Sequence, residues 1–462
     1  MLFNDGVERF TVVSYNILGD KNASKHKDLY PNVPSQYMKW SHRKRLISQE
    51  LFGWNPDIIC MQEVDRYFDL SSFMEKAGYV GSYKGRTGDN IDGCATFWKA
   101  DKFRLIEEVN IEFKEFGLRD NVAQISVFEV AICACFVVVL HFFAPVNYKT
   151  YLNLISRMFL NRKEEKIECC VYEFFVLCIW LRLCSSTGAQ MRRAKSRKLV
   201  VGNIHVLYNA IRGEVKLCQI CLLSSRAQVI SEKWGNAPVV LAGDFNITPQ
   251  SAIYQFLSSS ELNIKLYDRR ELSGQRSCHP AQVFGPKKEM SNPFAVIDSL
   301  QLTLLNTLTS LQCCLFLWCN NIHIGRHLFG LPRCFDHDSS FNKEVKVATG
   351  RHDCHLAVHP LKLYSSYASV KGSTKTRGLN DEPLATSYHF KFFGTVDYIW
   401  YSNGLVPTRV LDTLLVDTLR RTGGLPSKSL GSDHLALVSE FAFVPGTTKE
   451  GDKSTVSNYP SF

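Results

Sequence analysis

The sequence lacks the marks of a secreted or zinc-stabilised protein. Its first residues, MLFNDGVERF, contain no basic segment followed by an apolar one, so they do not form a typical secretory signal peptide. The 16 cysteines do not include the two closely spaced pairs of a zinc ribbon, and the adjacent pairs Cys169–Cys170 and Cys313–Cys314 lack that spacing. We therefore expect a chain that stays in a reducing compartment and holds no structural zinc.

The sequence also lacks an apolar run long enough to cross a bilayer. The most apolar stretch, residues 130–146, is shorter than the ~20 residues that a transmembrane helix needs, and it contains His141 and Pro145. We therefore expect no membrane span.

This stretch belongs to the first of two segments without regular periodicity, residues 130–184 and 300–340. Together they hold ten of the 16 cysteines, and neither shows the period of a strand or a helix. They could form the buried core of an inserted subdomain, since long insertions are often tolerated. Translated non-coding sequence, such as a retained intron or a faulty gene model, explains better why they start and stop abruptly. Both segments are interpreted as atypical insertions.

The rest of the 462-residue chain is consistent with a single catalytic domain at residues 8–445, followed by a disordered tail at residues 446–462. The net charge of +10 favours a polyanionic partner, because Lys and Arg side chains that neutralise phosphates release bound counterions. Many basic proteins bind no nucleic acid, so the charge alone does not identify the partner.

Strand-like and helix-like segments alternate outside the two insertions. Apolar runs that end at polar residues include FTVVSYNIL, DIICMQEV, KLVVGNIHVLY and APVVLAGDFN, while MKWSHRKRLISQELF and KLCQICLLSSRAQVISEKW have helical periodicity. Two further strand-like runs, GTVDYIWYS and GSDHLALVSEFAF, follow later in the chain. This alternation predicts a layered α/β (α+β) fold. Strand ends on a rigid sheet are common places for a functional site.

The polar residues at these strand ends have the chemistry of a metal-dependent phosphodiesterase. They are Asn16, Glu63, His205, Asp244, Asn246, Asp397, Asp433 and His434. Phosphodiester cleavage needs a metal that neutralises developing charge, a group that activates water, and a donor to the phosphate. Mg²⁺ prefers a few carboxylate oxygens and keeps several waters. Each residue taken alone is more often a solvated or turn residue, but their order and strand context favour a site.

The ordered motifs SYN, QEV, GDFN, VDYI and SDH resemble those of the endonuclease/exonuclease/phosphatase superfamily. GDNIDGCATFWK, GNIHVLYN, LAGDFNITP, HPLKLYSSYASVKG and LGSDHLALVSEF are similar to plant homologues of the carbon catabolite repressor protein 4 family of deadenylases. The resemblance covers residues 8–129, 190–298 and 340–445 and skips both insertions. It implies a four-layer α/β/β/α sandwich and a Mg²⁺-dependent 3′-to-5′ exoribonuclease that shortens poly(A) tails and releases 5′-AMP.

The resemblance also implies how Mg²⁺ and the attacking water are held. Glu63 would ligate the metal, with Asn16 beside it at the end of the neighbouring strand. Asp433 would complete the metal environment, directly or through water. Asp244 would activate or orient the attacking water.

The remaining residues are implied to act on the phosphate. Asn246 would hold a phosphate oxygen, and His205 would contact the scissile phosphate. His434 would stabilise the transition state. Asp397 would fix the tautomer of His434 and raise its basicity.

The expected adenine-binding residues match the family only in part. Deadenylases of this type hold an adenine between a Phe and a Pro; Phe392 matches the Phe, but Ala210 stands at the position of the Pro. The departure weakens the implied adenine preference, to which stacking contributes ~1–3 kcal/mol per base. A small-nucleotide phosphatase or 2′,5′-phosphodiesterase of the same superfamily is therefore an alternative. A catalytically defective isoform is another, because an insertion between strands could disrupt a packed sheet.

The expected partner is the single-stranded poly(A) tail of an RNA. Some members of the family bind a scaffold through a leucine-rich repeat, and this chain has no such repeat. Association with a deadenylase complex would therefore use another surface. The resemblance also implies a location in the cytoplasm and nucleus.

Overall fold

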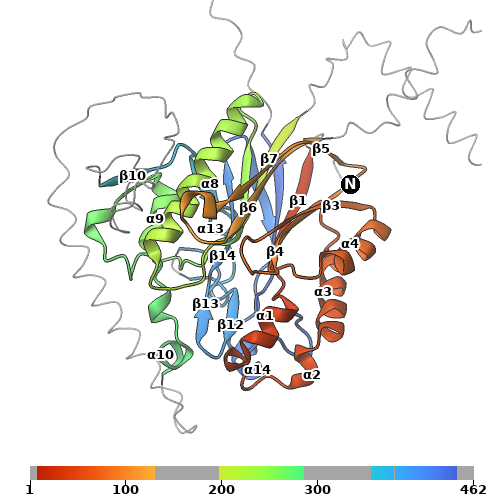
Figure 1. Cartoon of the computed structure of the whole chain (residues 1–462), viewed down its shortest axis with the longest axis vertical. Coiled ribbons are helices and arrows are strands. Elements are labelled where there is room, and N and C mark those ends of the chain that lie inside the picture. The colour runs from red at the N-terminus through yellow and green to blue at the C-terminus, as the bar shows by residue number, and fades with distance from the viewer. Residues whose placement is uncertain (1–7, 131–196, 286–354, 379, 445–462) are drawn as a thin grey trace, which may run out of the picture.

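Two six-stranded sheets pack face to face, and helices cover their outer faces (Figure 1). The computed structural model describes residues 8–130, 197–285, 355–378 and 380–444. The first sheet has the order β15 (Leu405–Val410), β16 (Leu437–Phe443), β1 (Arg9–Asn16), β2 (Ile58–Gln62), β4 (Gly93–Lys99) and β3 (Tyr79–Gly85). The second has the order β11 (Leu363–Ser365), β14 (Asp397–Ser402), β8 (Val239–Asp244), β7 (Lys198–His205), β6 (Val122–Val130) and β5 (Phe103–Glu112).

Helices and two short two-stranded sheets complete the described part of the fold. The small sheets pair β9 (Glu261–Asn263) with β10 (Leu356–Val358), and β12 (Ser387–His389) with β13 (Phe392–Gly394). The α-helices are α1 (Asp20–Lys25), α2 (Ser35–Met38), α3 (Trp40–Trp54), α4 (Tyr67–Lys76), α8 (Gly213–Lys233), α9 (Ala252–Ser259), α10 (Pro280–Phe284), α13 (Ser366–Ser369) and α14 (Val416–Thr422).

Side chains of alternate strand residues build the layers. In β1, Val12 belongs to the core between the two sheets, whereas Val13 packs with residues of α3 and α4 on the outer face. In β7, Val201 points into the same inter-sheet core and Val200 packs beneath α8. This period of two is the reason why strands buried on both faces read as continuous apolar runs. The predicted four-layer α/β/β/α sandwich is confirmed.

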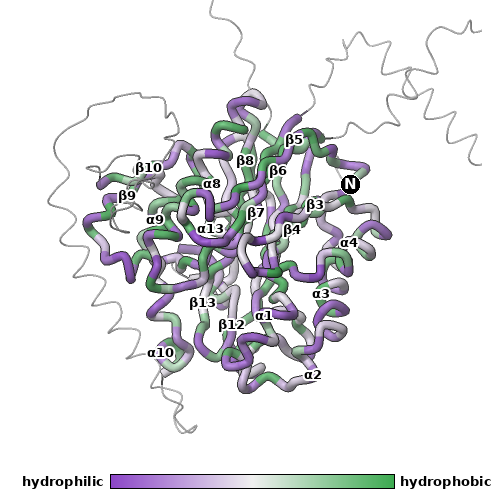
Figure 2. The backbone as a smooth tube through the Cα atoms, viewed as in Figure 1, coloured by the Kyte–Doolittle hydropathy of each residue, from purple (hydrophilic) through white to green (hydrophobic). Residues whose placement is uncertain are grey.

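The distribution of hydropathy follows the same layers. Figure 2 shows hydrophobic stretches concentrated in the central strands and hydrophilic stretches in the peripheral loops and helices. Helix α8 is an exception among the helices, because most of its residues are buried against the second sheet. It holds both Cys218 and Cys221 in the core beneath that sheet.

The register of the strands brings their polar ends together. Strands β7 and β8 run parallel with His205 opposite Asp244, and β14 runs antiparallel to β8 with Asp397 opposite the same Asp244. In the first sheet, β1 and β2 run parallel and place Asn16 opposite Gln62, next to Glu63. Because the two sheets face each other, these ends meet at one edge of the sandwich.

The predicted insertions at 130–184 and 300–340 and the tail at 446–462 lie outside the described residues, except for Val130. The described residues show where the chain leaves β6 before the first insertion and where it enters β7 after it. The backbone N–H of Val130 donates to the carbonyl of Arg197 at 2.9 Å, so the chain leaves β6 and enters β7 at neighbouring positions. These positions lie at the end of β7 opposite to His205. The first insertion therefore follows the end of β6 that lies far from the predicted site.

Within the described ranges, no helix combines the length and apolar composition needed to span a membrane. Apart from Val130, the apolar stretch 130–146 lies outside these ranges.

Candidate active site

A cavity of about 280 Å³ opens where the strand ends of the two sheets converge. Seven of the predicted site residues line it: Glu63, His205, Asp244, Asn246, Phe392, Asp433 and His434. The two others, Asn16 and Asp397, are buried behind these residues and bond to them. The structure therefore brings all the predicted site residues together, from the ends of β1, β2, β7, β8 and β14, from β13 and from the loop before β16.

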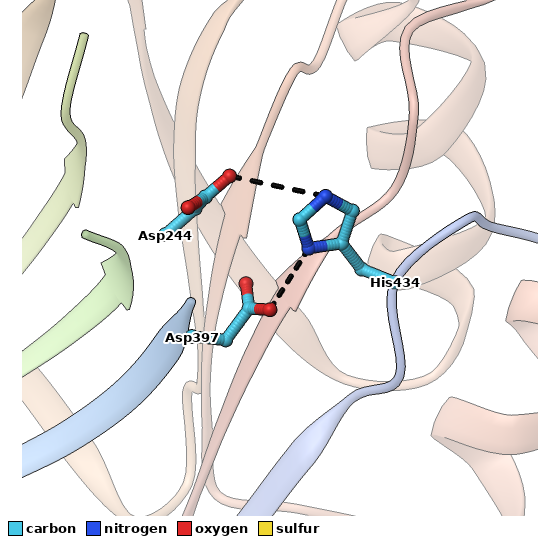
Figure 3. A group of neighbouring side chains, drawn as sticks. All are labelled: Asp244, Asp397 and His434. Atoms are coloured by element: carbon cyan, nitrogen blue, oxygen red, sulfur yellow. Dashed lines mark hydrogen bonds and ion pairs between the residues drawn. The ribbon is translucent and has the colours of Figure 1, made fainter. Parts of the chain in front are cut away.

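His434 lies between two carboxylates (Figure 3). Its Nδ1 is 2.8 Å from Oδ2 of Asp397, and its Nε2 is 3.9 Å from Oδ2 of Asp244. Burial lowers the pKa of His434, but the charge and hydrogen bond of Asp397, followed by the charges of Asp433 and Asp244, raise that pKa well above its ordinary value. Burial and the charge of Asp397 likewise raise the pKa of Asp244, against the opposing effect of His205 and His434. The arrangement favours a cationic His434 whose Nε2–H faces the cavity.

Asp244 joins the two sheets. Its Oδ2 accepts a hydrogen bond of 3.1 Å from Nδ2 of Asn16, which belongs to the first sheet, and lies 3.5 Å from Nε2 of His205. Its Oδ1 accepts from the backbone N–H of Asn246 at 2.9 Å. This carboxylate is therefore held in one orientation, with one oxygen at the centre of the polar cluster.

Glu63 is held on both of its oxygens. Oε1 accepts from Nδ2 of Asn16 at 3.0 Å, and Oε2 accepts from Nδ2 of Asn22 at 3.0 Å and from the backbone N–H of Gly19 at 3.2 Å. Burial raises the pKa of Glu63, but the charge of His205 and the hydrogen bonds from Asn22 and Asn16 outweigh burial and lower that pKa to about 2. Glu63 also has a φ of 56°, a left-handed conformation that costs a side-chain-bearing residue roughly 1–3 kcal/mol.

Asp433 offers a buried oxygen that is not satisfied by the described residues. Its Oδ2 accepts from the hydroxyl of Tyr30 at 2.9 Å, while its Oδ1 has no hydrogen-bond partner among them. Burial raises the pKa of Asp433 against the opposing charge of His434. A buried carboxylate oxygen without a donor is a natural position for a cation.

These donors fit a hard divalent ion. Glu63, Asp433 and Asp244 supply carboxylate oxygens around one cavity, and Mg²⁺ binds one or two such groups while retaining water and substrate oxygens. Ligand atoms of Asp244, Asp397 and His434 also lie within 4.8 Å of one another. However, the hydrogen bond between Asp397 and His434 already uses the atoms that face each other. Oδ1 of Asp397 also lacks a hydrogen-bond partner among the described residues, but Asp397 does not line the cavity, whereas Glu63 and Asp433 do. Glu63 and Asp433 are therefore the better candidates for metal ligands.

The predicted adenine-binding residues are only partly placed in the cavity. Phe392 lines it from the β12–β13 sheet, and the ring of His389 lies 6.0 Å from the ring of Phe392. Tyr208 also lines the cavity and is 55% exposed. Ala210 is not among the lining residues.

Sequence reasoning missed several residues that support the site, and one of them is the fully buried Arg43. Its Nη1 donates to the carbonyls of Ile17 at 3.0 Å, Leu18 at 2.7 Å and Gly431 at 3.3 Å. It thereby ties the loop after β1 to the loop that precedes Asp433. A signal was available, because Arg43 lies one helical turn before the buried Ile47 on the apolar face of α3.

We expect the change Arg43→Leu to lower the free energy of unfolding by about 3 kcal/mol, because it leaves three buried carbonyls without their donor. Urea unfolding followed by circular dichroism measures the change. Arg45→Leu is the matched control, since Arg45 is exposed on the same helix and should alter stability by no more than about 0.5 kcal/mol. Equal losses in the two variants would contradict a bridging role for Arg43.

Comparisons with known proteins agree with this geometry. A model of the Endonuclease/Exonuclease/phosphatase family matches residues 13–141 and 218–434. The chain is 49% identical to carbon catabolite repressor protein 4 homolog 3 of Arabidopsis thaliana, over 96% of this chain and 77% of that protein. Homolog 5 of the same plant is 39% identical, over 96% of this chain and 79% of that protein.

A likeness to solved structures supports the fold. The crystal structure of ANGEL2, a 2′,3′-cyclic phosphatase, in complex with adenosine-2′,3′-vanadate is 23% identical in sequence, with a TM-score of 0.60. The similarity covers 95% of this chain and 97% of that chain.

Proposed function

Because the chain belongs to the endonuclease/exonuclease/phosphatase family, and within it to the homologues of carbon catabolite repressor protein 4, we propose that it is a Mg²⁺-dependent 3′-to-5′ exoribonuclease that shortens poly(A) tails and releases 5′-AMP. Membership of the family makes it a metal-dependent hydrolase of phosphodiester or phosphate bonds. The observation that carries the finer proposal is the presence of an aromatic side chain, Phe392, in the same cavity as the hydrolytic residues.

The metal would be held by Glu63 and Asp433, with Asn16 orienting Glu63. When bound, Mg²⁺ neutralises charge that develops on the phosphate oxygens. The low pKa of Glu63 keeps this carboxylate ionised and ready to accept a cation. The hydroxyl of Tyr30 donates to Oδ2 of Asp433, whereas Oδ1 accepts no hydrogen bond from the described residues and remains available to the metal.

The attacking water would be oriented by Asp244, whose Oδ2 lies between the imidazoles of His205 and His434. This carboxylate accepts a proton from the water as the new P–O bond forms, while the bond between phosphorus and the 3′ oxygen of the preceding nucleotide breaks and that oxygen takes up a proton from solvent. His434 donates its Nε2–H to a phosphate oxygen, because Asp397 holds the Nδ1–H. The side-chain amide of Asn246, in the loop after β8, contributes a further donor.

The wall of the cavity suits a nucleotide at the 3′ end of a single strand. Phe392 and Tyr208 offer aromatic surface on which a base can stack, and Lys25, His26 and Arg86 line the same cavity with groups that can contact a phosphate backbone. The net charge of +10 favours association with RNA. Stacking tolerates any base, so it supports binding at a strand end more directly than a preference for adenine.

The test is cleavage of a 5′-labelled RNA that ends in an oligo(A) tail, in Mg²⁺ or EDTA. We expect a ladder that shortens from the 3′ end in Mg²⁺ and no cleavage in EDTA. The variant Glu63→Gln should lower the rate about 10²- to 10³-fold at limiting Mg²⁺, because a neutral amide binds the cation poorly. Glu232→Gln, at the far end of α8, is the matched control and should cleave at the wild-type rate.

The same assay addresses the defective-isoform alternative. Since Val130 and Arg197 are hydrogen-bonded neighbours, residues 131–196 can be replaced by a two-residue Asn-Gly turn without separating β6 from β7. Equal activity of the full chain and this shortened chain argues against the alternative. Activity of the shortened chain alone would identify the full chain as the defective form.

A second candidate is a phosphatase or phosphodiesterase that acts on small nucleotides or on 2′,5′ linkages. The observation in its favour is that Ala210 supplies no ring opposite Phe392 and does not line the cavity. A panel of oligo(A), oligo(U), 2′,5′-linked oligoadenylate and an RNA with a 2′,3′-cyclic phosphate end separates the candidates. Faster turnover of either of the last two than of oligo(A) would replace the deadenylase proposal.

A further inference from the structure

Asn246 is held by the surrounding protein on each of its polar groups. Its backbone N–H donates to Oδ1 of Asp244 at 2.9 Å, and its backbone carbonyl accepts from Nζ of Lys216 at 2.8 Å. In the side chain, Nδ2 donates to the carbonyl of Val206 at 3.0 Å, and Oδ1 accepts from Nε2 of Gln275 at 3.0 Å. The backbone φ of 51° places Asn246 in the left-handed region, which asparagine tolerates better than most residues.

Lys216 is a fully buried lysine that points from α8 towards this loop. Its Nζ donates to the carbonyls of Asn246 and Tyr208, the latter at 3.3 Å, and to Oε1 of Gln275. The three acceptors match the three hydrogens of an ammonium group. Lys216 is therefore satisfied by neutral acceptors rather than by a paired carboxylate, which is unusual for a lysine with no exposed surface.

The contacts of Lys216 determine the direction of the hydrogen bonds that run through Gln275 to the side chain of Asn246. An ammonium group has no acceptor, so Gln275 must turn its oxygen to Lys216 and its NH₂ to Asn246. Asn246 must then turn its oxygen to Gln275. Its Nδ2 is left with one hydrogen for Val206 and a second that nothing in this chain of contacts uses.

We propose that Lys216 and Gln275 are positioning residues that set the polarity of the Asn246 side chain, so that its N–H rather than its carbonyl faces a phosphate oxygen of the substrate. The inference rests on the proposed phosphodiesterase function of this cavity, of which Asn246 and Gln275 are lining residues. A reversed amide would place an acceptor against the anionic phosphate. Correct polarity therefore turns Asn246 from a repulsive group into a donor.

The proposal predicts that Gln275→Glu is less active than Gln275→Met. A merely structural role for Gln275 predicts the opposite order of activity. In Gln275→Glu the size is kept and the contact with Lys216 becomes an ion pair, but the second oxygen cannot donate to Oδ1 of Asn246. Oδ1 of Asn246 then faces a second acceptor, and a reversed amide would instead set that oxygen against the carbonyl of Val206, so the donor orientation of Asn246 is lost or weakened. In Gln275→Met the contact with Asn246 is lost without being reversed. The glutamate variant should therefore be the less active enzyme, although it is the better mimic of the native shape and polarity.

The experiment compares the full-length wild type, Gln275→Glu and Gln275→Met, with kcat and KM measured on oligo(A) RNA in Mg²⁺. Burial lowers the pKa of Lys216 to about 7, so the assay is run at a pH below this value, where the ammonium predominates. We expect kcat to fall about 10²-fold in Gln275→Glu and about 10-fold in Gln275→Met, with KM changed less than kcat. The melting temperature of Gln275→Glu should equal or exceed that of Gln275→Met.

Affinity for 5′-AMP in Mg²⁺, measured by calorimetry on the same three proteins, gives a second readout that does not require turnover. Weaker binding by Gln275→Glu than by Gln275→Met supports the proposal even if oligo(A) RNA proves not to be the substrate, in which case only the proposed function fails. Equal or better activity and binding of Gln275→Glu relative to Gln275→Met would overturn the proposal.

Discussion

Replacement of Asp244 by asparagine is expected to lower kcat on the proposed RNA substrate by about 10⁴-fold. Oδ2 of this carboxylate lies 3.5 Å from Nε2 of His205 and 3.9 Å from Nε2 of His434, so it is the anionic group at the centre of the site. An amide at this position can neither accept the proton of the attacking water nor balance the charge of His434. KM should change far less than kcat, because the loss concerns the transition state.

The control for Asp244→Asn must separate lost chemistry from lost stability. Asp412→Asn removes a carboxylate that pairs with the buried Arg377 at 2.7 Å, on residues that do not line the cavity. We expect this control to unfold more easily and to keep its kcat. Asp244→Asn should keep most of its free energy of unfolding. Burial raises the pKa of Asp244 and so disfavours its charged form, and a neutral amide of the same shape does not carry that cost. A kcat within tenfold of wild type for a folded Asp244→Asn would remove Asp244 from the mechanism.

The second large effect concerns His434 and Asp397, which we expect to act as one unit. Each of the variants His434→Asn and Asp397→Asn should lower kcat about 10³-fold, because Asp397 acts through the imidazole by holding its Nδ1–H at 2.8 Å. The double variant should then be no slower than His434→Asn alone. The measurement is a double-mutant cycle on kcat at saturating Mg²⁺.

The cycle also decides whether Asp397 is a metal ligand. Ligand atoms of Asp244, Asp397 and His434 lie within 4.8 Å of one another, which is close enough for all three residues to bind one cation. If Asp397 holds metal, Asp397→Asn should raise the Mg²⁺ concentration needed for half-maximal activity, and the two fold-losses in kcat should multiply to about 10⁶-fold, because independent free-energy changes add. If it acts on His434 alone, the Mg²⁺ requirement stays that of the wild type.

Many of the strand segments and the residues at their ends could be predicted from the sequence because both leave local signals. Apolar runs that stop at Asn16, Glu63, His205 and Asp244 mark strands buried on both faces, and sites form where such strands end. The motif order added the family and therefore the four layers. Helix α8 was predicted from its periodicity and is present as Gly213–Lys233.

The supporting contacts could not be predicted in this way, because they join residues far apart in the chain. Asn16 and Asp244 are 228 positions apart and bond across the two sheets, and Lys216 and Gln275 are 59 positions apart. In the sequence, Lys216 is one charged residue of a helix and Gln275 one polar residue of a loop. Neither has a local feature that marks it as buried.

The sequence by itself therefore determined the layered fold, the family and the eight polar residues at the strand ends. The periodicity of apolar residues and the polar residues that end each strand are both patterns of residues close together in the chain. Only the tertiary structure decided how those residues face one another: which nitrogen of His434 meets Asp397, and which atom of Asn246 meets Gln275. The physical reason is that hydrogen-bond direction depends on which donors and acceptors become neighbours, and packing of the two sheets makes them neighbours.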